Sequence, residues 1–186
     1  MKRSLFNFVA FQAGWFACVL SAADGMPWLG LVVVSLVVIL HVQMSEWRTD
    51  ELVLVFVAVA LGLLFDSLLV MSGWLSYSSG ILISGIAPYW ILAMWALFAT
   101  TINLSMSWLK GKPLLASVLG AIFGPLSYMA GERLGAMEFV NYQSAIIALA
   151  LIWALVMPLL VTVAIRLEGS RKPAPLIPLQ RLPTGE

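Results

Sequence analysis

Long apolar segments alternate with short polar ones along the chain. Six of them approach or exceed the roughly 20 mostly apolar residues that a helix needs to cross the hydrocarbon core of a bilayer. The pattern therefore predicts an all-α, polytopic membrane protein with six transmembrane helices. The predicted spans are Leu5–Ala23, Pro27–Met44, Leu52–Val70, Pro88–Leu109, Leu114–Gly131 and Ser144–Ile165.

The polar breaks between these segments carry helix-start and loop signals. Pro27, Pro88 and Pro113 lie at or just before a predicted first turn, where a missing backbone N–H costs nothing. The charged run Glu46–Glu51 separates the second span from the third. The uncharged segment Met71–Ala87 is too long for a simple turn, and an interfacial or re-entrant piece is a candidate there.

The composition excludes several classes of protein. Of the 186 residues, 62% are hydrophobic and 10% are charged, and the mean hydropathy is +1.01. A soluble domain has about 25% charged residues, and one of this length cannot bury so much apolar surface in an aqueous core. A soluble enzyme, a nucleic-acid-binding protein and a disordered chain are therefore excluded. The single cysteine, Cys18, and single histidine, His41, argue against a disulfide framework and a metal site, and we expect no cofactor.

Lysine and arginine residues are distributed unequally between the two sides of a six-span topology. Only Arg133 would lie on one side, and all the others would lie opposite it. Short cytoplasmic loops carry the excess of positive charge, so both termini are predicted to be cytoplasmic. The residues on that side are Lys2, Arg3, Arg48, Lys110, Lys112, Arg166, Arg171, Lys172 and Arg181.

The two ends of the chain differ from its middle. Residues 1–168 form the predicted transmembrane domain, and residues 169–186 form a Pro-rich tail that we expect to be disordered and cytoplasmic. The first segment also has features of a cleavable signal peptide. Its bulky Trp15-Phe16 centre and the spans that follow favour its retention.

An internal repeat is suggested by a constant offset of 58 residues. At this offset, Leu61–Gly73 shares Leu, Gly, Phe and Met positions with Leu119–Gly131, and Trp95–Leu97 matches Trp153–Leu155. Spans three and four would then form one helical hairpin, and spans five and six a second copy in parallel orientation. A weaker match of the first two spans suggests a pseudo-threefold bundle. Chance similarity among abundant residues is the alternative.

Asp66 is the polar residue whose placement in a membrane costs the most free energy, because it is ionisable. Such a side chain is therefore expected to face the interior of the bundle. Its depth matches that of Ser127 and Tyr128 on span five, whereas Arg133 lies about 13 Å further out by helical rise. We therefore expect Tyr128 or Ser127 to bond Asp66. A proton or cation site and a hydrogen-bonded packing residue are both open readings of Asp66.

A second polar layer is expected nearer the cytoplasmic face. Gln12, His41 and Asn103 fall at similar depths, and Thr100, Asn103 and Ser107 share one face of a continuous helix. A water-filled vestibule or a polar head-group pocket is the functional reading. Hydrogen bonds between helices, which are common for Ser and Thr in membranes, are the alternative.

Spans five and six contain features that shape helices. Gly120 and Gly124 offer a small-residue face for close packing. Pro125 predicts a kink or break in span five, and Pro158 a kink in span six. Beyond span five, Glu132–Arg133 would form a solvated outer mouth, with binding of anionic groups as a lesser possibility.

Catalytic signatures are absent from the sequence. A single histidine excludes a two-histidine zinc site, and the chain has neither a phosphate-binding P-loop nor a Gly-x-Ser-x-Gly elbow. Asp66 and His41 would lie in opposite halves of the membrane, so they do not suggest an acid–base pair.

Two stretches of the chain, Ala99–Leu109 and Gly124–Ala136, carry a resemblance to a known family. They resemble the most recognisable parts of a family of small bacterial inner-membrane proteins, catalogued as domain of unknown function 2878. The similarity covers nearly the whole chain except the tail. It implies a bacterial inner-membrane location and genes lying beside those for membrane fatty-acid modification. It implies no particular activity and no catalytic residues.

Three functions are compatible with these observations. The first is a small transporter or an accessory protein in lipid or envelope homeostasis, with the bilayer and a lipid or other small molecule as partners. The second is a lipid-modifying enzyme that uses Asp66, His41 or Asn103, and the third is a structural subunit that docks a soluble partner. A polar cavity from Asp66 to His41 would favour transport, a lateral groove ending at either residue would favour an enzyme, and a fully packed bundle would favour docking.

Overall fold

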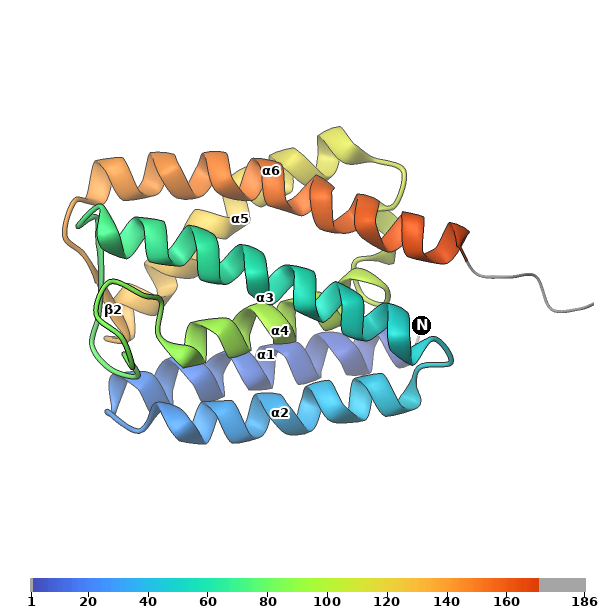
Figure 1. Ribbon diagram of the computed structural model, residues 1–186, viewed down its shortest axis with the longest axis horizontal. Coiled ribbons are helices and arrows are strands. Elements are labelled where there is room, and N and C mark those ends of the chain that lie inside the picture. Colours follow the sequence, from blue (N-terminus) through green and yellow to red (C-terminus); the bar gives the residue numbers. More distant parts are fainter. Residues whose placement is uncertain (1, 171–186) are drawn as a thin grey trace, which may run out of the picture.

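A computed structural model describes residues 2–170 of the chain as a bundle of six helices (Figure 1). The helices run up and down along one long axis, so that α1 begins and α6 ends at the same end of the bundle. We call this the terminal end, and the opposite end, which carries two short strands, the strand end. Of the tail expected to be disordered, 169–186, Gly169 is the last residue of α6, and 171–186 lie outside the described residues. The elements are α1 (Lys2–Ala23), α2 (Pro27–Met44), α3 (Arg48–Met71), β1 (Leu75–Tyr77), α4 (Tyr89–Ile102), the 3₁₀ turn η1 (Ser107–Leu109), α5 (Pro113–Arg133), β2 (Met137–Phe139) and α6 (Tyr142–Gly169).

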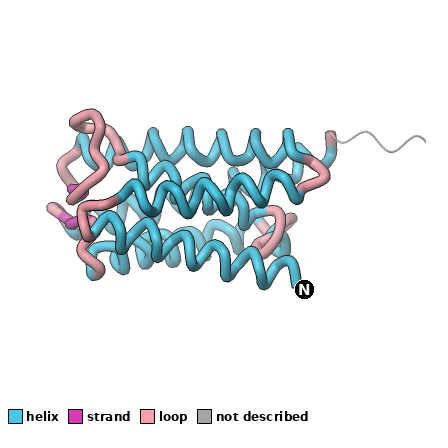
Figure 2. The backbone as a smooth tube through the Cα atoms, turned by 90° about the horizontal axis from the view of Figure 1, so that it is seen from below, coloured by secondary structure: helices cyan, strands magenta, loops and turns pink. Residues whose placement is uncertain are grey.

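Five of these helices are long and apolar enough to cross a membrane, namely α1, α2, α3, α5 and α6. The prediction of a mostly helical protein with several helices apolar enough to span a membrane is thereby confirmed. Pro27 and Pro113 begin their helices, as predicted. Loops gather at the two ends of the bundle and leave the middle to helices (Figure 2).

The fourth apolar segment departs from the prediction, because α4 has only 14 residues and ends at Ile102. Its last turn is rich in residues that bond the backbone locally. The Thr100 hydroxyl donates to the Leu97 carbonyl at 2.7 Å, and the Thr101 hydroxyl to that of Phe98 at 2.6 Å. The expected single helix over Pro88–Leu109 is therefore wrong, and turns and η1 complete the segment.

The short helix α4 lies at the centre of the bundle. It packs against α1, α2, α3 and α6, whereas α5 packs mainly against α6. Its side chains include some of the most completely buried in the protein, such as Trp90, Leu97 and Ile102. A short apolar helix is thus surrounded by longer helices.

Three helices end in the same type of cap. In α1, α3 and α5, a glycine with positive φ follows the helix, and the next residue donates its N–H to a carbonyl in the last turn. The glycines are Gly25 (φ 74°), Gly73 (φ 69°) and Gly135 (φ 87°). Gly73 and Gly135 are 62 residues apart, so the 58-residue offset does not extend to these helix ends.

The strand end is closed by the β1–β2 pair and by the loop that precedes α4. The two strands are antiparallel, with Leu75 opposite Phe139 and Tyr77 opposite Met137. The loop is tied down by the hydroxyl of Ser79, which donates to the Ala22 carbonyl at 2.7 Å. The segment after α3 therefore forms an ordered cover over one end of the bundle.

Of the kink or break expected at Pro125, the break is wrong, because α5 is a single helix from Pro113 to Arg133; the kink stays a prediction. Pro158 lies within a continuous α6, and the kink expected there stays a prediction. A proline removes one N–H from the helix ladder, and here the close packing of α5 on α6 supports the remaining turns. A Cβ atom at Gly120 would lie 2.2 Å from the Trp153 carbonyl oxygen, so this face of α5 admits only glycine there.

Candidate functional site

Asp66 of α3 lies in the interior of the bundle and is 1% exposed. Its carboxylate accepts three hydrogen bonds from side chains on three other elements. The hydroxyls of Tyr77 and Tyr128 donate to Oδ1 at 2.8 and 2.7 Å, and Trp95 Nε1 donates to Oδ2 at 2.7 Å. The predicted bond from Tyr128 is confirmed. The other candidate, Ser127, instead donates to the Gly124 carbonyl in its own helix.

The Asp66 cluster is composed of one carboxyl group and three uncharged donors. Hydrogen bonds to a charged group are worth about 1.5–3 kcal/mol each, so the donors offset the cost of placing a carboxylate among helices. Burial, and then the Asp66 carboxylate, raise the pKa of Tyr77 well above its ordinary value, which keeps its hydroxyl a donor. The described residues contain no ion pair to Asp66, and Arg133 is exposed at the strand end.

Two stacked indoles extend the Asp66 cluster. The rings of Trp95 on α4 and Trp153 on α6 lie 4.7 Å apart with an interplanar angle of 9°. Each ring is packed against a glycine, because a Cβ atom at Gly62 or Gly124 would lie 2.2 Å from a ring carbon of Trp95 or Trp153. The two indoles differ in their N–H groups. That of Trp95 bonds Asp66, whereas that of Trp153 is buried and has no partner among the described residues.

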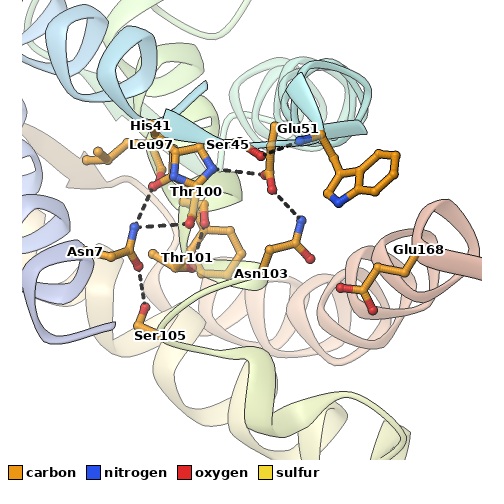
Figure 3. A network of polar contacts seen from close by, with 12 residues as sticks. Asn7, His41, Ser45, Glu51, Leu97, Thr100, Thr101, Asn103, Ser105 and Glu168 are labelled. Atoms are coloured by element: carbon orange, nitrogen blue, oxygen red, sulfur yellow. Dashed lines mark hydrogen bonds and ion pairs between the residues drawn. The ribbon is translucent and has the colours of Figure 1, made fainter. Parts of the chain in front are cut away.

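A separate polar network lies towards the terminal end of the bundle (Figure 3). Glu51 is 5% exposed, and its two oxygens are held by different elements. His41 Nε2 on α2 lies 3.0 Å from Oε2, and Asn103 Nδ2 donates to Oε1 at 3.0 Å. Lys110 Nζ then donates to Asn103 Oδ1 at 2.8 Å and pairs with Glu168 of α6. The network thus connects α2, α3 and α6 through the segment after α4.

A smaller group of contacts joins α1 to the end of α4. Asn7 Nδ2 donates to the Thr100 carbonyl at 3.1 Å, and the Ser105 hydroxyl donates to Asn7 Oδ1 at 2.7 Å (Figure 3). These contacts give hydrogen-bond partners to the Thr100 carbonyl and to the Asn7 side chain near the end of α4. The Asn7–Thr100 contact is a helix–helix hydrogen bond of the kind that the sequence offered as the alternative to a vestibule, whereas Ser105 bonds Asn7 from the turn after α4.

The predicted second polar layer is therefore only partly assembled. The structure brings His41 and Asn103 together through Glu51, but Gln12 lies elsewhere and lines a cavity described below. The predicted face of Thr100, Asn103 and Ser107 is not formed, because α4 ends before Asn103. Ser107 is exposed and donates to the Leu104 carbonyl.

Of the two residues of the predicted outer mouth, Glu132 and Arg133, Glu132 makes a structural hydrogen bond. Glu132 Oε1 accepts the backbone N–H of Phe139 at 3.0 Å and so ties the end of α5 to β2. Arg133 and Glu138 are exposed. The Glu132 side chain is thus engaged with the backbone of the strand pair.

A cavity of about 500 Å³ lies between α1, α4 and α5, with α6 contributing to its wall. On α5 its lining runs from Leu119 to Gly131, which is about 18 Å of helix. It reaches the surface of the bundle, since Phe123 (61% exposed), Leu126 (46%) and Trp108 (52%) all line it. It is therefore an elongated lateral groove. Its aromatic lining residues are Phe11, Trp15, Trp90, Trp95, Phe98, Trp108, Phe123, Tyr128 and Trp153.

The groove touches the Asp66 cluster only through its donors. Trp95 and Tyr128 line it, whereas Asp66 lies behind them, and none of its lining residues is charged. His41 is also absent from its lining. The groove therefore does not join the Asp66 cluster to the terminal-end network by a polar path.

Several members of these sites were not predicted. Glu51 was assigned to a charged loop, but α3 begins three residues earlier, at Arg48, and so turns Glu51 into the bundle. A carboxylate in a first helical turn is favoured by the helix dipole, which was an available signal. Tyr77 reaches Asp66 from the short strand β1, which no periodicity in the sequence reveals. Trp95 was found as a repeat position, but its contact with Asp66 was not predicted.

The fold and the groove define a class: a helical protein with membrane-spanning character and an apolar lateral groove beside one buried carboxyl group. No group of three potential metal ligands occurs among the described residues.

The chain belongs to the family described as protein of unknown function (DUF2878), whose model matches residues 4–159. Comparison with curated proteins and with solved structures gives no match.

Proposed function

We propose that the protein binds the apolar part of a lipid-like molecule in the lateral groove, as an accessory or carrier protein in lipid or envelope homeostasis. The groove itself carries this proposal. Its volume falls in the range of small-molecule sites, about 300–1,000 Å³, and its length suits an extended chain lying parallel to the helices. Its exposed edge at Phe123 and Leu126 would let a ligand enter from the bilayer.

The groove favours binding over the other functions considered. Transport of an ion would be supported by a polar route between Asp66 and His41, and the groove includes neither residue. A lipid-modifying enzyme would need a reactive group facing the ligand, whereas the oxygens of Asp66 are bonded by three donors behind the wall. A docking subunit needs no internal groove. In this reading Asp66 holds Trp95 and Tyr128 in place as parts of the wall.

We also propose a membrane arrangement. The chain crosses a bacterial inner membrane six times, with the terminal end in the cytoplasm. In support, α4 and the segment to Leu109 together extend towards the terminal end. The non-helical part of this segment is packed within protein, and non-helical backbone inside a membrane needs such shielding from lipid. The described Lys and Arg residues other than Arg133 lie in the first turns of α1 and α3, in the segment from η1 to α5 and in the last turns of α6. These parts of the chain are at the terminal end (Figure 1). Accessibility of single cysteines introduced at Ser76 and Gly111 to an impermeant reagent, in a Cys18→Ser background, tests this orientation. Labelling of Gly111→Cys from the outside would contradict it.

We propose further that α3–α4 and α5–α6 are copies of one hairpin. Equivalent indoles stack on each other, each against a glycine of the preceding helix, and equivalent caps end α3 and α5. The strand pairing is also reciprocal, because Leu75 faces Phe139 while Tyr77 faces Met137. An experimental structure in which a rotation about the membrane normal fails to superpose the hairpins would refute the repeat.

The binding function is tested by purifying the protein from membranes in a mild detergent and identifying retained molecules by native mass spectrometry. Ser127→Phe places a ring in the groove and is expected to reduce the retained ligand at least about tenfold. Ser35→Phe is the matched control, because Ser35 is exposed on α2 and does not line the groove. Equal retention by both variants, or no retained molecule in the unaltered protein, would overturn the proposal.

A further inference from the structure

The loop between β1 and α4 exposes three consecutive aliphatic side chains at the strand end. Ile81 is 49% exposed, Leu82 79% and Ile83 62%. We call these three residues the loop tip. The sequence around the tip is free of charge, because no charged residue and no histidine occurs between Asp66 and Lys110. Contiguous exposed apolar surface marks a contact with another protein, a ligand or a membrane.

The loop tip belongs to an ordered segment that is fixed on both sides. Before the tip, the Ser79 hydroxyl is bonded to α1, as described above. After the tip, the Ala87 N–H donates to Ser67 Oγ of α3 at 3.0 Å. Within the segment, the Ile86 N–H donates to the Ile83 carbonyl at 3.1 Å. The exposure of the tip is therefore a property of a folded loop.

The bond between Ala87 and Ser67 sets the depth of the loop along α3. This helix begins with charged residues, and its apolar part, residues 52–71, is about 30 Å long by helical rise. That length equals the hydrocarbon thickness of a typical bilayer. Met71 then lies at the strand-end boundary of the hydrocarbon, and Ser67 lies about 6 Å inside it. Because the loop returns to Ser67, the tip lies close to this boundary.

The loop tip continues the exposed apolar surface of α2 and α3. A Cβ atom at Gly85 would lie 3.6 Å from Met71 Cγ, and one at Gly80 would lie 3.4 Å from Pro27 Cγ. The residues that bracket the tip thus lie against the end of α3 and the start of α2. Beside them, Met71 is 72% exposed, and Trp28 in the first turn of α2 is 54% exposed. Tryptophan is enriched at membrane–water interfaces, so Trp28 marks the same boundary.

We infer that the loop tip inserts into the boundary between head groups and acyl chains in the leaflet at the strand end, and so anchors this end of the bundle. The partner is the lipid surface itself. An aliphatic, uncharged tip is held there by apolar burial and needs no particular head group. The inference rests on the proposed membrane arrangement and is independent of binding in the groove.

The test uses the full-length protein in phosphatidylcholine nanodiscs, with a nitroxide on single cysteines in a Cys18→Ser background. Electron paramagnetic resonance power saturation compares collisions of the label with O₂, which concentrates in lipid, and with nickel EDDA, which stays in water. Leu82→Cys probes the tip. Leu64→Cys is the lipid control, because Leu64 is 53% exposed in the apolar part of α3. Ser76→Cys is the water control, because Ser76 is exposed on β1 opposite Glu138.

The ratio of O₂ to nickel collisions should be several times higher at Leu82 than at Ser76, and highest at Leu64. A Leu82 ratio equal to that of Ser76, with Leu64 still high, overturns the insertion and leaves the membrane arrangement standing. Shielding of the Leu82 label from both reagents also overturns it, because protein then covers the tip. A Leu64 ratio as low as that of Ser76 overturns the membrane arrangement as well. Ile83→Cys repeats the measurement if Leu82→Cys does not fold.

Discussion

Two buried carboxylates, Asp66 and Glu51, are held in different ways at different depths of the same bundle. Asp66 accepts hydrogen bonds from three uncharged groups and is separated from solvent. Glu51 is bound by His41 and by Asn103, which continues to Lys110 at the protein surface. The first cluster is closed and depends on fixed dipoles, whereas the second is a chain of charged and amide groups that reaches water. The comparison indicates that the Asp66 cluster maintains the shape of the groove and that the Glu51 network fastens helix ends.

Removal of the Asp66 carboxylate is the strongest test of this difference. Asp66→Ala leaves the donors of Tyr77, Tyr128 and Trp95 without an acceptor, at about 1–3 kcal/mol for each buried group. We expect a loss of at least about 3 kcal/mol in the free energy of unfolding, measured by denaturant titration in detergent micelles with circular dichroism. Asp24→Ala is the control, because Asp24 is exposed in the turn after α1. Similar stability of the two variants would mean that the cluster does not support the fold.

The glycines behind the stacked indoles give the next largest effect. Gly62→Ala and Gly124→Ala would each bring a methyl group within about 2.2 Å of a tryptophan ring, and overpacking of this kind costs about 1–3 kcal/mol. Thermal denaturation should show both variants destabilised. Gly169→Ala is the matched control, since a Cβ there meets nothing within 4 Å. If the two core variants melt at the temperature of the control, the indoles are not held as rigidly as the groove requires.

Much of the fold could be predicted from sequence because lipid imposes a simple rule on helix length. Five long apolar helices, the starts at Pro27 and Pro113, and the bond between Tyr128 and Asp66 followed from hydropathy, proline chemistry and helical rise. The end of α4 at Ile102 was missed because hydropathy does not register the bonds that Thr100 and Thr101 make with their own backbone. A break was one of the two outcomes expected at Pro125, and it does not occur; the sequence does not show how closely α5 packs against α6.

The candidate site was less predictable than the fold, for a physical reason. Asp66 could be found because one charge in an apolar helix is conspicuous. Its partner Tyr77 comes from the three-residue strand β1, which the sequence pattern does not predict. The groove arises from the space between α1 and α5, which no local pattern records. The role of Glu51 was missed because a helix can begin within a charged run and turn one of its residues inward.

Substitution in the Glu51 network should lower the free energy of unfolding less than substitution of Asp66. Glu51→Gln keeps an oxygen for Asn103 but removes the charge beside His41, and we expect a loss of about 1–2 kcal/mol in the free energy of unfolding. A double-mutant cycle with His41→Gln isolates their coupling, which should fall between about 0.5 and 3 kcal/mol for two groups in contact. Additive effects of the two substitutions would show that His41 and Glu51 are neighbours without an energetic link.

The outermost pair, Lys110 with Glu168, should give the smallest effect, because its side chains are 17% and 38% exposed. Exposed ion pairs are worth about 0–1 kcal/mol and weaken as salt screens them. Lys110→Met is therefore expected to cost less than Glu51→Gln, and the part of that cost due to Glu168 should disappear in about 1 M salt. Lys112→Met serves as control, since Lys112 lies over the Trp108 ring outside the network. A Lys110–Glu168 coupling energy that persists at high salt would show that this pair is shielded from solvent, as Asp66 is. The Asp66 cluster and the Glu51 network would then differ only in the chemical type of their hydrogen-bond donors.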